Sequence, residues 1–373
     1  VEALHGLAAS LQTQHISELP RAAHKKGDHA PDAALDAANS RLTDLFGQAE
    51  TVDARLIERN RLFTEETGRR QSELSQAEEA AHAQLTERLA VLDEAIAERR
   101  AAQAEQLALM AAELGAREVF LYEAAEVAGV AAKHLKAAKA RNCHLMPCHS
   151  TEMTDPPQVD LVVSETLGNY PFEENIIETL NDARRRFLKR GGSIIPQGLV
   201  QRVAPVVAPR IHRELCAWDG TGFDMRFAKT MSLNNIYVRT LAPKELLDAG
   251  ASATTWDTID FGRENTTRRK GEARWTLSAP STIYGFATWW DAELTPGVTL
   301  STAPGAPRTH WEQLYFPLLE PIAADAGETV AVSLRSRTSF EAGTHVAWTA
   351  THSDAKGRQR SRQALNLDKG FLP

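Results

Sequence analysis

The distribution of apolar and polar residues divides this chain into three parts, and the first part is mainly helical in pattern. Residues 1 to about 40 show little periodicity and predict a partly mobile arm with short helices. Between Gly68 and Gly115 there is no glycine or proline, and strong helix formers dominate. A largely apolar stripe along one face of a helix is indicated by residues at helical spacing, namely Leu74, Ala81, Leu85, Leu92, Ile96, Gln103, Leu107, Met110 and Leu114. This spacing predicts a long helix that packs on another helix or folds back at Gly68.

Strand and helix patterns alternate between residues 118 and 196. Short apolar runs at 118–122, 144–146 and 161–163 are typical of buried strands. Apolar residues at helical spacing follow the first run over 127–138, and a second helix is expected over 175–189. The resulting βαβαβ order predicts a parallel sheet with helices on its faces.

After Pro196 the pattern changes to short segments that are rich in β-branched and aromatic residues. These segments are 274–277, 282–290, 298–301, 329–336 and 344–351. Pro296-Gly297 and Lys356-Gly357 provide turn signals between them. Short strands separated by turns predict an antiparallel sheet or barrel, so the fold class is α/β followed by β.

Composition narrows the range of functions. The hydrophobic content of 43% and the charged content of 24% are ordinary for a soluble globular protein. A net charge of −7 gives no electrostatic reason to expect a nucleic-acid partner. The chain has 3 cysteines, too few for a disulfide framework. No apolar run is long enough for a membrane span and no signal peptide is visible, so we expect a cytoplasmic protein without a membrane partner.

Three carboxylates gather after the third predicted strand. Glu165 lies two positions beyond the apolar run 161–163, and Glu173 and Glu174 follow on the same connection. Open α/β sheets bind ligands at the carboxyl ends of their strands. Crowded carboxylates either share a proton or hold a cation. These acids therefore indicate a site for a cationic substrate, or else they decorate the surface of a loop.

Two Cys-His pairs form another candidate site. Cys143-His144 and Cys148-His149 contain residue types that ligate zinc. Their spacing is not that of a zinc finger, and no second pair of cysteines completes four ligands. Alternation along a strand is the favoured interpretation, and no metal is predicted.

The acidic connection resembles the double-glutamate loop of the protein arginine N-methyltransferases. In that family Ser-Glu is followed by two residues, a glycine, and a second glutamate nine places after the first. The residues that fit are Ser164, Glu165, Gly168 and Glu174. Gly222-Phe223-Asp224-Met225 and Thr309-His310-Trp311 resemble two further segments of the family, in the same order. The resemblance covers about residues 107–373.

This resemblance implies a division of the chain, a cofactor and a set of site residues. The parts are a helical segment over 1–106, a Rossmann-like methyltransferase domain over 107–196, and a β-barrel substrate-binding domain over 197–373. The implied cofactor is S-adenosyl-L-methionine, and the implied assembly is a homodimer. The implied roles are catalysis for Glu165 and Glu174, substrate binding for His310, Trp311 and Glu173, and cofactor binding for Glu123, Glu152 and Ser164.

The cofactor side departs from the family pattern. Residues 111–117 resemble the helix and turn that follow the family's Gly-rich loop, so its glycines should fall near Ala101, Gln103 and Glu105. No glycine is present there. The aromatic N-terminal motif is also missing, since the first tyrosine is Tyr122. An unusual mode of cofactor binding, a non-catalytic relative, and a partner chain that completes the site are all consistent with this departure.

Two functions follow from these observations. The first is methyl transfer to an arginine guanidinium in a protein, a peptide or free arginine. The second is a non-catalytic scaffold that binds partners through its helical N-terminus. Retention of both glutamates with the Thr-His-Trp segment favours the enzyme, and the missing Gly-rich loop favours the scaffold.

Overall fold

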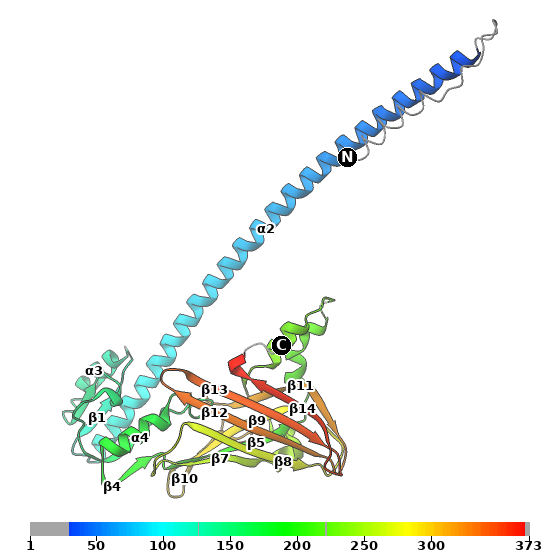
Figure 1. Ribbon diagram of the computed structural model, residues 1–373. Helices are drawn as coiled ribbons and strands as arrows, with labels where there is room; N and C mark the ends of the chain where they lie inside the picture. The colour runs from blue at the N-terminus through cyan, green and yellow to red at the C-terminus, as the bar shows by residue number, and fades with distance from the viewer. Residues whose placement is uncertain (1–29, 126, 221, 370–373) are drawn as a thin grey trace. The chain divides into compact units, whose positions relative to one another are not determined.

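The computed structural model describes residues 30–125, 127–220 and 222–369 (Figure 1). The chain divides into two compact units, Val1–Glu94 and Ala95–Pro373. Most of the predicted N-terminal arm, residues 1–29, lies outside the described residues. Among the described helices, none is long and apolar enough to cross a membrane.

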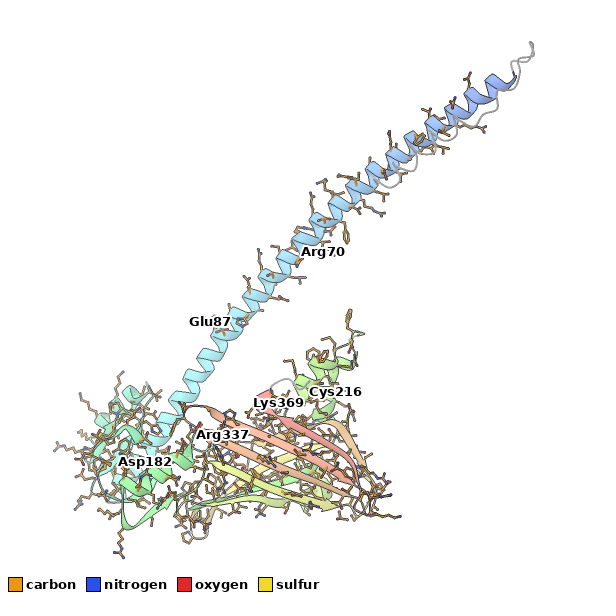
Figure 2. All side chains as sticks on the ribbon, viewed as in Figure 1. Arg70, Glu87, Asp182, Cys216, Arg337 and Lys369 are labelled. Atoms are coloured by element: carbon orange, nitrogen blue, oxygen red, sulfur yellow. The ribbon has the colours of Figure 1, made fainter. Side chains whose placement is uncertain are left out.

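Helix α2 runs without interruption from Ala30 to Glu113. It passes through Gly68, so the predicted bend at this residue is wrong. A single glycine costs only about 1 kcal/mol in a helix interior, too little to break a helix by itself. Ion pairs within the helix flank this position: Arg61 lies 2.7 Å from Glu58 and 2.5 Å from Glu65. Side chains project from all sides of the helix at this level, where Arg70 is labelled (Figure 2).

Four strands form two parallel pairs instead of the single parallel sheet that the sequence predicted. Strand β1 (Val119–Tyr122) pairs with β2 (Cys143–Met146), and β3 (Val159–Val163) pairs with β4 (Leu188–Ile195). Helices α3 (Ala128–Ala137) and α4 (Ile176–Arg186) form the predicted crossovers. In the described part of the chain no strand joins the two pairs.

The remaining strands form two antiparallel sheets. One has the order β6-β11-β9-β5-β7, with β10 paired to β9, and the other has the order β14-β13-β12-β8. Their bounds are β5 (Gly198–Val206), β6 (Tyr237–Arg239), β7 (Thr254–Asp260), β8 (Arg268–Thr276), β9 (Ser281–Thr295), β10 (Val298–Ser301), β11 (Gln313–Ala324), β12 (Thr329–Ser339), β13 (Gly343–Ser353) and β14 (Gln359–Asn366). The described strands do not close into a barrel.

Large aromatic side chains join the two antiparallel sheets in one core. Trp275 of β8 stacks on Phe286 of β9 with ring centroids 5.8 Å apart. Phe316 of β11 meets Trp348 of β13 edge-on at 5.3 Å. All four are buried, and full burial of an apolar side chain of this kind contributes about 1.5–3 kcal/mol. The aromatic contacts therefore explain why the sheets stack face to face.

The six-stranded sheet also has a second, smaller core on its other face. Trp290 belongs to the first core and its neighbour Trp289 to the second, as expected for successive residues of a strand. Ile211 of helix α5 (Arg210–Leu215) and Leu233 of helix α6 (Arg226–Leu233) complete the second core. The sheet is thus covered on both faces.

Just before β12, the buried carboxylate of Glu328 is surrounded by hydrogen-bond and ion-pair partners. Glu328 accepts a hydrogen bond from the Asp325 N–H at 3.0 Å, lies 2.8 Å from His352 Nε2, and pairs with Arg360 at 2.8 Å. The pKa of Glu328 is lowered, chiefly by the hydrogen bond from the Asp325 N–H. Burial is the second-largest influence and acts in the opposite direction, and the hydrogen bond with His352 lowers the pKa further. A lowered folded-state pKa stabilises the fold above the unfolded carboxyl pKa, and this stabilisation is lost as pH falls through the folded value.

We therefore expect Glu328→Gln to lower the thermal unfolding midpoint at neutral pH. The difference from wild type should shrink as the pH falls through the folded-state pKa, because wild-type Glu328 then also becomes neutral. Circular dichroism melts across the acid range measure this. Glu341→Gln, at an exposed position, is the matched control and should change little. A difference that stays constant with pH would exclude a role for the charge.

Candidate functional site

The double-glutamate loop, residues 164–175, connects β3 to α4. The Ser164 N–H donates to the Ile195 carbonyl at 2.9 Å, which extends the β3–β4 pairing into the loop. The side chains of Glu165 and Glu174 are partly buried, whereas Glu173 is exposed. The loop ends at Asn175, which has a left-handed backbone with φ of 59° before α4 begins. The structure thus places one partly buried acid, Glu165, just after a parallel strand and a second, Glu174, just before α4.

Apolar residues between the two acids fix the loop to the core of the antiparallel sheets. Tyr170 and Phe172 are buried in that core, together with Ile176 and Ile177 of α4. The Tyr170 hydroxyl also forms a hydrogen bond with Ser336 Oγ of β12. The loop is therefore held at its centre, between Glu165 and Glu174.

The Thr-His-Trp segment contacts the double-glutamate loop directly. Trp311 Nε1 donates to the Leu167 carbonyl at 2.5 Å, and Asn169 Nδ2 donates to the Trp311 carbonyl at 2.6 Å. Trp290 Nε1 adds a third hydrogen bond, to the Gly168 carbonyl at 3.2 Å. Two hydrogen bonds thus join segments about 140 residues apart in sequence, and a third ties the loop to β9.

His310 lies beside this junction. Its ring centroid is 4.0 Å from that of Trp311, with an angle of 35° between the planes. The following residue, Glu312, has φ of 47° and accepts a hydrogen bond from Thr240 Oγ1 at 2.6 Å. The contacts of Trp311 and Glu312 hold the segment directly after His310, whose ring lies against the tryptophan that contacts the acidic loop.

Glu173 folds back over its own loop. Its Oε1 accepts a hydrogen bond from the Asn169 N–H at 2.7 Å. A Cβ atom at Gly168 would lie only 2.1 Å from the same oxygen, so this arrangement requires glycine at position 168. Glu173 therefore supports the shape of the loop.

The predicted cofactor acids follow the two paired strands β1 and β2. Glu123 comes directly after β1 and accepts a hydrogen bond from the Ala125 N–H at 2.9 Å. Glu152 is exposed at the end of a short 3₁₀ helix, Ser150–Glu152, that Arg186 holds through the Ser150 carbonyl at 3.1 Å. Because β1 and β2 are parallel, both acids follow strand ends at the same edge.

The Gly-rich side of such a cofactor site has no counterpart in the described residues. Ala101, Gln103 and Glu105, where glycines were expected, all lie within α2. Glu105 is 5% exposed, and its carboxylate lies 2.8 Å from Nδ1 of His134 on α3. Backbone N–H groups inside a helix are already bonded to carbonyls of the preceding turn and cannot cradle a ligand. These residues therefore do not fit S-adenosylmethionine on this side.

The Cys-His pairs have other contacts. Cys143 Sγ lies 3.6 Å from the Ala108 carbonyl, and His144 Nε2 lies 2.5 Å from Glu118. His149 Nδ1 lies 2.7 Å from the Thr151 hydroxyl. Within the described ranges no three potential ligands gather as a metal site would require.

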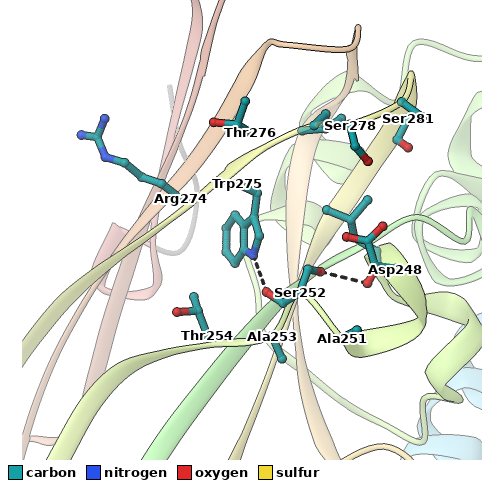
Figure 3. A pocket seen from close by; sticks show the side chains of 13 residues that line it. Asp248, Ala251, Ser252, Ala253, Thr254, Arg274, Trp275, Thr276, Ser278 and Ser281 are labelled. Carbon is teal, nitrogen blue, oxygen red and sulfur yellow. Dashed lines mark hydrogen bonds between the residues drawn. The ribbon is translucent and has the colours of Figure 1, made fainter.

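A cavity of about 430 Å³ lies elsewhere, between the segments 247–254 and 274–281 (Figure 3). Trp275 Nε1 donates to the Ser252 carbonyl at 2.8 Å across it. Neither the double-glutamate loop nor the Thr-His-Trp segment contributes to its lining. The cavity is therefore separate from the candidate site.

Sequence reasoning missed two residues of the site, Trp290 and Asn169. Both side chains donate hydrogen bonds to main-chain carbonyls, Trp290 to Gly168 of the acidic loop and Asn169 to Trp311. The pair Trp289-Trp290 within a long β segment was the available signal, since an indole N–H inside a core needs a hydrogen-bond acceptor.

Comparisons with known proteins agree with this arrangement. A family model described as the arginine methyltransferase oligomerization subdomain matches residues 202–347. Protein arginine N-methyltransferase 6 of Xenopus tropicalis is 26% identical over 270 residues, which cover 69% of this chain and 79% of that protein. Human protein arginine N-methyltransferase 2 is 27% identical over 192 residues, which cover 48% of this chain and 44% of that protein.

Solved structures show the same fold. The enzyme-prozyme heterotetrameric complex of Trypanosoma brucei PRMT1 with AdoHcy has a TM-score of 0.61 at 20% identity, covering 70% of this chain and 84% of that chain. Arabidopsis thaliana protein arginine methyltransferase 10, in an open conformation, has a TM-score of 0.58 at 20% identity, with coverage of 69% and 84%. At this identity the two structures show the fold of the chain. The chain is thus similar to protein arginine N-methyltransferases in sequence, and its residues 202–347 match the oligomerization subdomain of arginine methyltransferases.

Proposed function

We propose that this protein is an S-adenosylmethionine-dependent N-methyltransferase that acts on an arginine guanidinium. The observation that carries the proposal is the junction of two loops, in which Trp311 and Asn169 tie the Thr-His-Trp segment to the double-glutamate loop. The relatives are arginine methyltransferases, and the Trypanosoma brucei structure contains AdoHcy, the product form of the methyl donor.

The chemistry of the substrate explains why two carboxylates are needed. A guanidinium is planar, always charged and carries a fork of N–H donors that carboxylates match in bidentate fashion. Glu165 and Glu174 bind and orient this group, and the Trp311 indole forms a wall beside it. S-adenosylmethionine, when bound, supplies the methyl group. The substrate is an arginine-containing protein or peptide, or free arginine.

We also propose three functional parts, with boundaries at residues 106 and 196. The first is the helical N-terminal segment, the second a Rossmann-like methyltransferase domain and the third a barrel-type substrate-binding domain. The parallel pairs and crossover helices support the second part, and the two stacked antiparallel sheets support the third. A cytoplasmic location is proposed from the composition alone.

Arginine recognition can be tested without the methyl donor. Calorimetric titration should compare a short peptide that has one central arginine with its lysine counterpart. We expect the arginine peptide to bind at least about tenfold more tightly, because only guanidinium offers a planar fork of donors to two carboxylates. Equal binding of both peptides would contradict the proposed substrate.

A specific observation favours a second function, assembly through α2. Apolar residues with heptad-like spacing are exposed along one face of the helix, namely Leu42, Leu45, Val52, Leu56 and Phe63. Phe63 is 72% exposed and Leu45 is 62% exposed. The paired charges of Glu58, Arg61 and Glu65 lie on the opposite face. Since the stability of helices in proteins comes mostly from packing of an apolar face, we propose that two copies of the chain pair along this stripe in parallel.

Cysteine cross-linking tests this pairing. In a parallel dimer Leu56→Cys should form a disulfide with the same residue of the second copy under mild oxidation. Ala54→Cys, on the opposite face of the helix, is the matched control and should remain monomeric on a non-reducing gel. The native cysteines are all partly buried, and oxidised wild type provides the baseline. Equal cross-linking of the two variants, or of neither, would argue against the stripe as an interface.

A further inference from the structure

The two parallel strand pairs are what remains of a doubly wound sheet when its central strand is removed. Such sheets commonly have the strand order 3-2-1-4-5, in which the first strand lies between the second and the fourth. The observed pairs β2-β1 and β3-β4 correspond to 3-2 and 4-5. Within the described residues, β1 pairs only with β2, and β3 pairs only with β4. Among the described strands, the outer edges of β1 and β3 therefore have no ladder partner, and the same holds for the outer edges of β2 and β4.

Apolar surface is exposed where a central strand and its crossover helix would lie. On β3, Leu161 is 48% exposed and Val163 is 50% exposed. On the last turns of α2, Leu107 is 44% exposed and Met110 is 49% exposed. Parallel strands are normally covered on both faces and read as continuous apolar runs. The exposure of β3 therefore shows that an apolar layer of the sheet is missing.

The end of β1 also has a group without its expected partner. The ring of Tyr122 meets Phe187 edge-on, with centroids 5.5 Å apart. The Tyr122 hydroxyl is buried and lacks a hydrogen-bond partner in the described part of the chain. Buried hydroxyl groups in native proteins are normally hydrogen-bonded. The ring contact between Tyr122 and Phe187 therefore connects the two strand pairs but leaves the Tyr122 hydroxyl without a hydrogen bond to any described residue.

We propose that a β-strand from outside these 373 residues inserts in parallel between β1 and β3, and that a glycine-rich turn after this strand completes the cofactor site. The proposal rests on the proposed function. Only a strand can bond to two ladder edges at once, and its side chains must be apolar to cover Leu161 and Val163. The turn must be glycine-rich because backbone has to approach a nucleotide closely, and residues 101–105 are helical instead.

Neither the described strands nor the sequence of residues 1–29 offers a segment of this kind. Every described strand is already paired with another. Residues 1–29, which lie outside the described ranges, contain glycine only at Gly6 and Gly27 and β-branched residues only at Val1, Thr13 and Ile16. A second copy of the chain would bring the same residues, so it cannot supply the strand either.

A synthetic peptide can test the strand site on the full chain. The probe has five Val and Leu residues followed by a Gly-x-Gly-x-x-Gly turn, with flanking lysines for solubility. The control peptide has proline at the middle of the strand, which removes a ladder hydrogen bond. Hydrogen exchange read by mass spectrometry should show new protection at residues 119–122 and 159–163 with the probe, and none with the control. Absence of protection in these two segments would overturn the proposal.

Variants of the chain and cofactor binding complete the experiment. Leu161→Lys should lower the affinity of the chain for the probe peptide at least tenfold. Val298→Lys, at an exposed apolar position of β10, should leave this affinity unchanged. S-adenosylhomocysteine should bind at micromolar concentration only when the probe is present. Micromolar binding to the chain alone would overturn the inference and support the proposed function. Protection of both strands without cofactor binding would retain the strand site and contradict the methyl transfer.

Discussion

Replacing Glu165 with glutamine is expected to weaken binding of an arginine peptide by about 10- to 100-fold while leaving the fold intact. The substitution keeps the size of the side chain and removes its charge. A hydrogen bond to a charged group contributes about 1.5–3 kcal/mol, which corresponds to this range. Glu165 is partly buried at the end of β3, where the Ser164 N–H already continues the strand pairing. Calorimetry measures the affinity, and a circular dichroism melt checks the fold.

Glu173→Gln is the matched control for this prediction. The amide oxygen of glutamine can still accept the hydrogen bond from the Asn169 N–H, so the loop should keep its shape. We therefore expect less than about a threefold change in arginine affinity, well under the loss for a charged hydrogen bond. Equal losses in Glu165→Gln and Glu173→Gln would show that the peptide senses the total charge of the loop, without specific binding by Glu165.

Local patterns predicted individual elements of the fold better than their connections. The segment 298–301 became β10 with the predicted bounds, and 175–189 contains α4. The bend at Gly68 failed because neighbouring helix formers and ion pairs outweigh one glycine. The parallel sheet became two pairs because strands pair through partners that local periodicity does not identify. The missing glycines were visible in the sequence, and so was the helix through residues 101–105, which lies inside the helix predicted between Gly68 and Gly115.

The candidate site shows the same contrast. The spacing from Glu165 to Glu174 could be read from the chain, and the resemblance connected it with His310 and Trp311. The contact between Leu167 and Trp311 spans 144 residues and depends on how the antiparallel sheets stack. The back-folded Glu173 also depends on three-dimensional structure, since its partner is a backbone N–H of its own loop. Residue types were therefore predictable, whereas the contacts that Glu173 and Trp311 make were not.

Replacing Trp311 with alanine is expected to lower the free energy of unfolding by about 3 kcal/mol, because a large side chain that packs on Trp290 at 5.0 Å is removed. Trp311→Phe keeps an aromatic ring and loses only the hydrogen bond to the Leu167 carbonyl, so we expect the free energy of unfolding to fall by about 1 kcal/mol. Urea denaturation measures both values. If the junction positions the acids, arginine affinity should also fall in both variants, although neither change touches a carboxylate.

Trp218→Phe separates positioning from general destabilisation. Trp218 Nε1 donates to Ser232 Oγ at 3.0 Å, so the same substitution also removes one indole hydrogen bond, at a place outside the site. We expect this variant to keep the arginine affinity of the wild type. If Trp311→Phe is destabilised but binds arginine as tightly as Trp218→Phe does, the bond to Leu167 serves only folding. A selective loss in Trp311→Phe means that the Thr-His-Trp segment acts on the guanidinium through the main chain of the acidic loop, since that bond ends on a carbonyl two residues after Glu165.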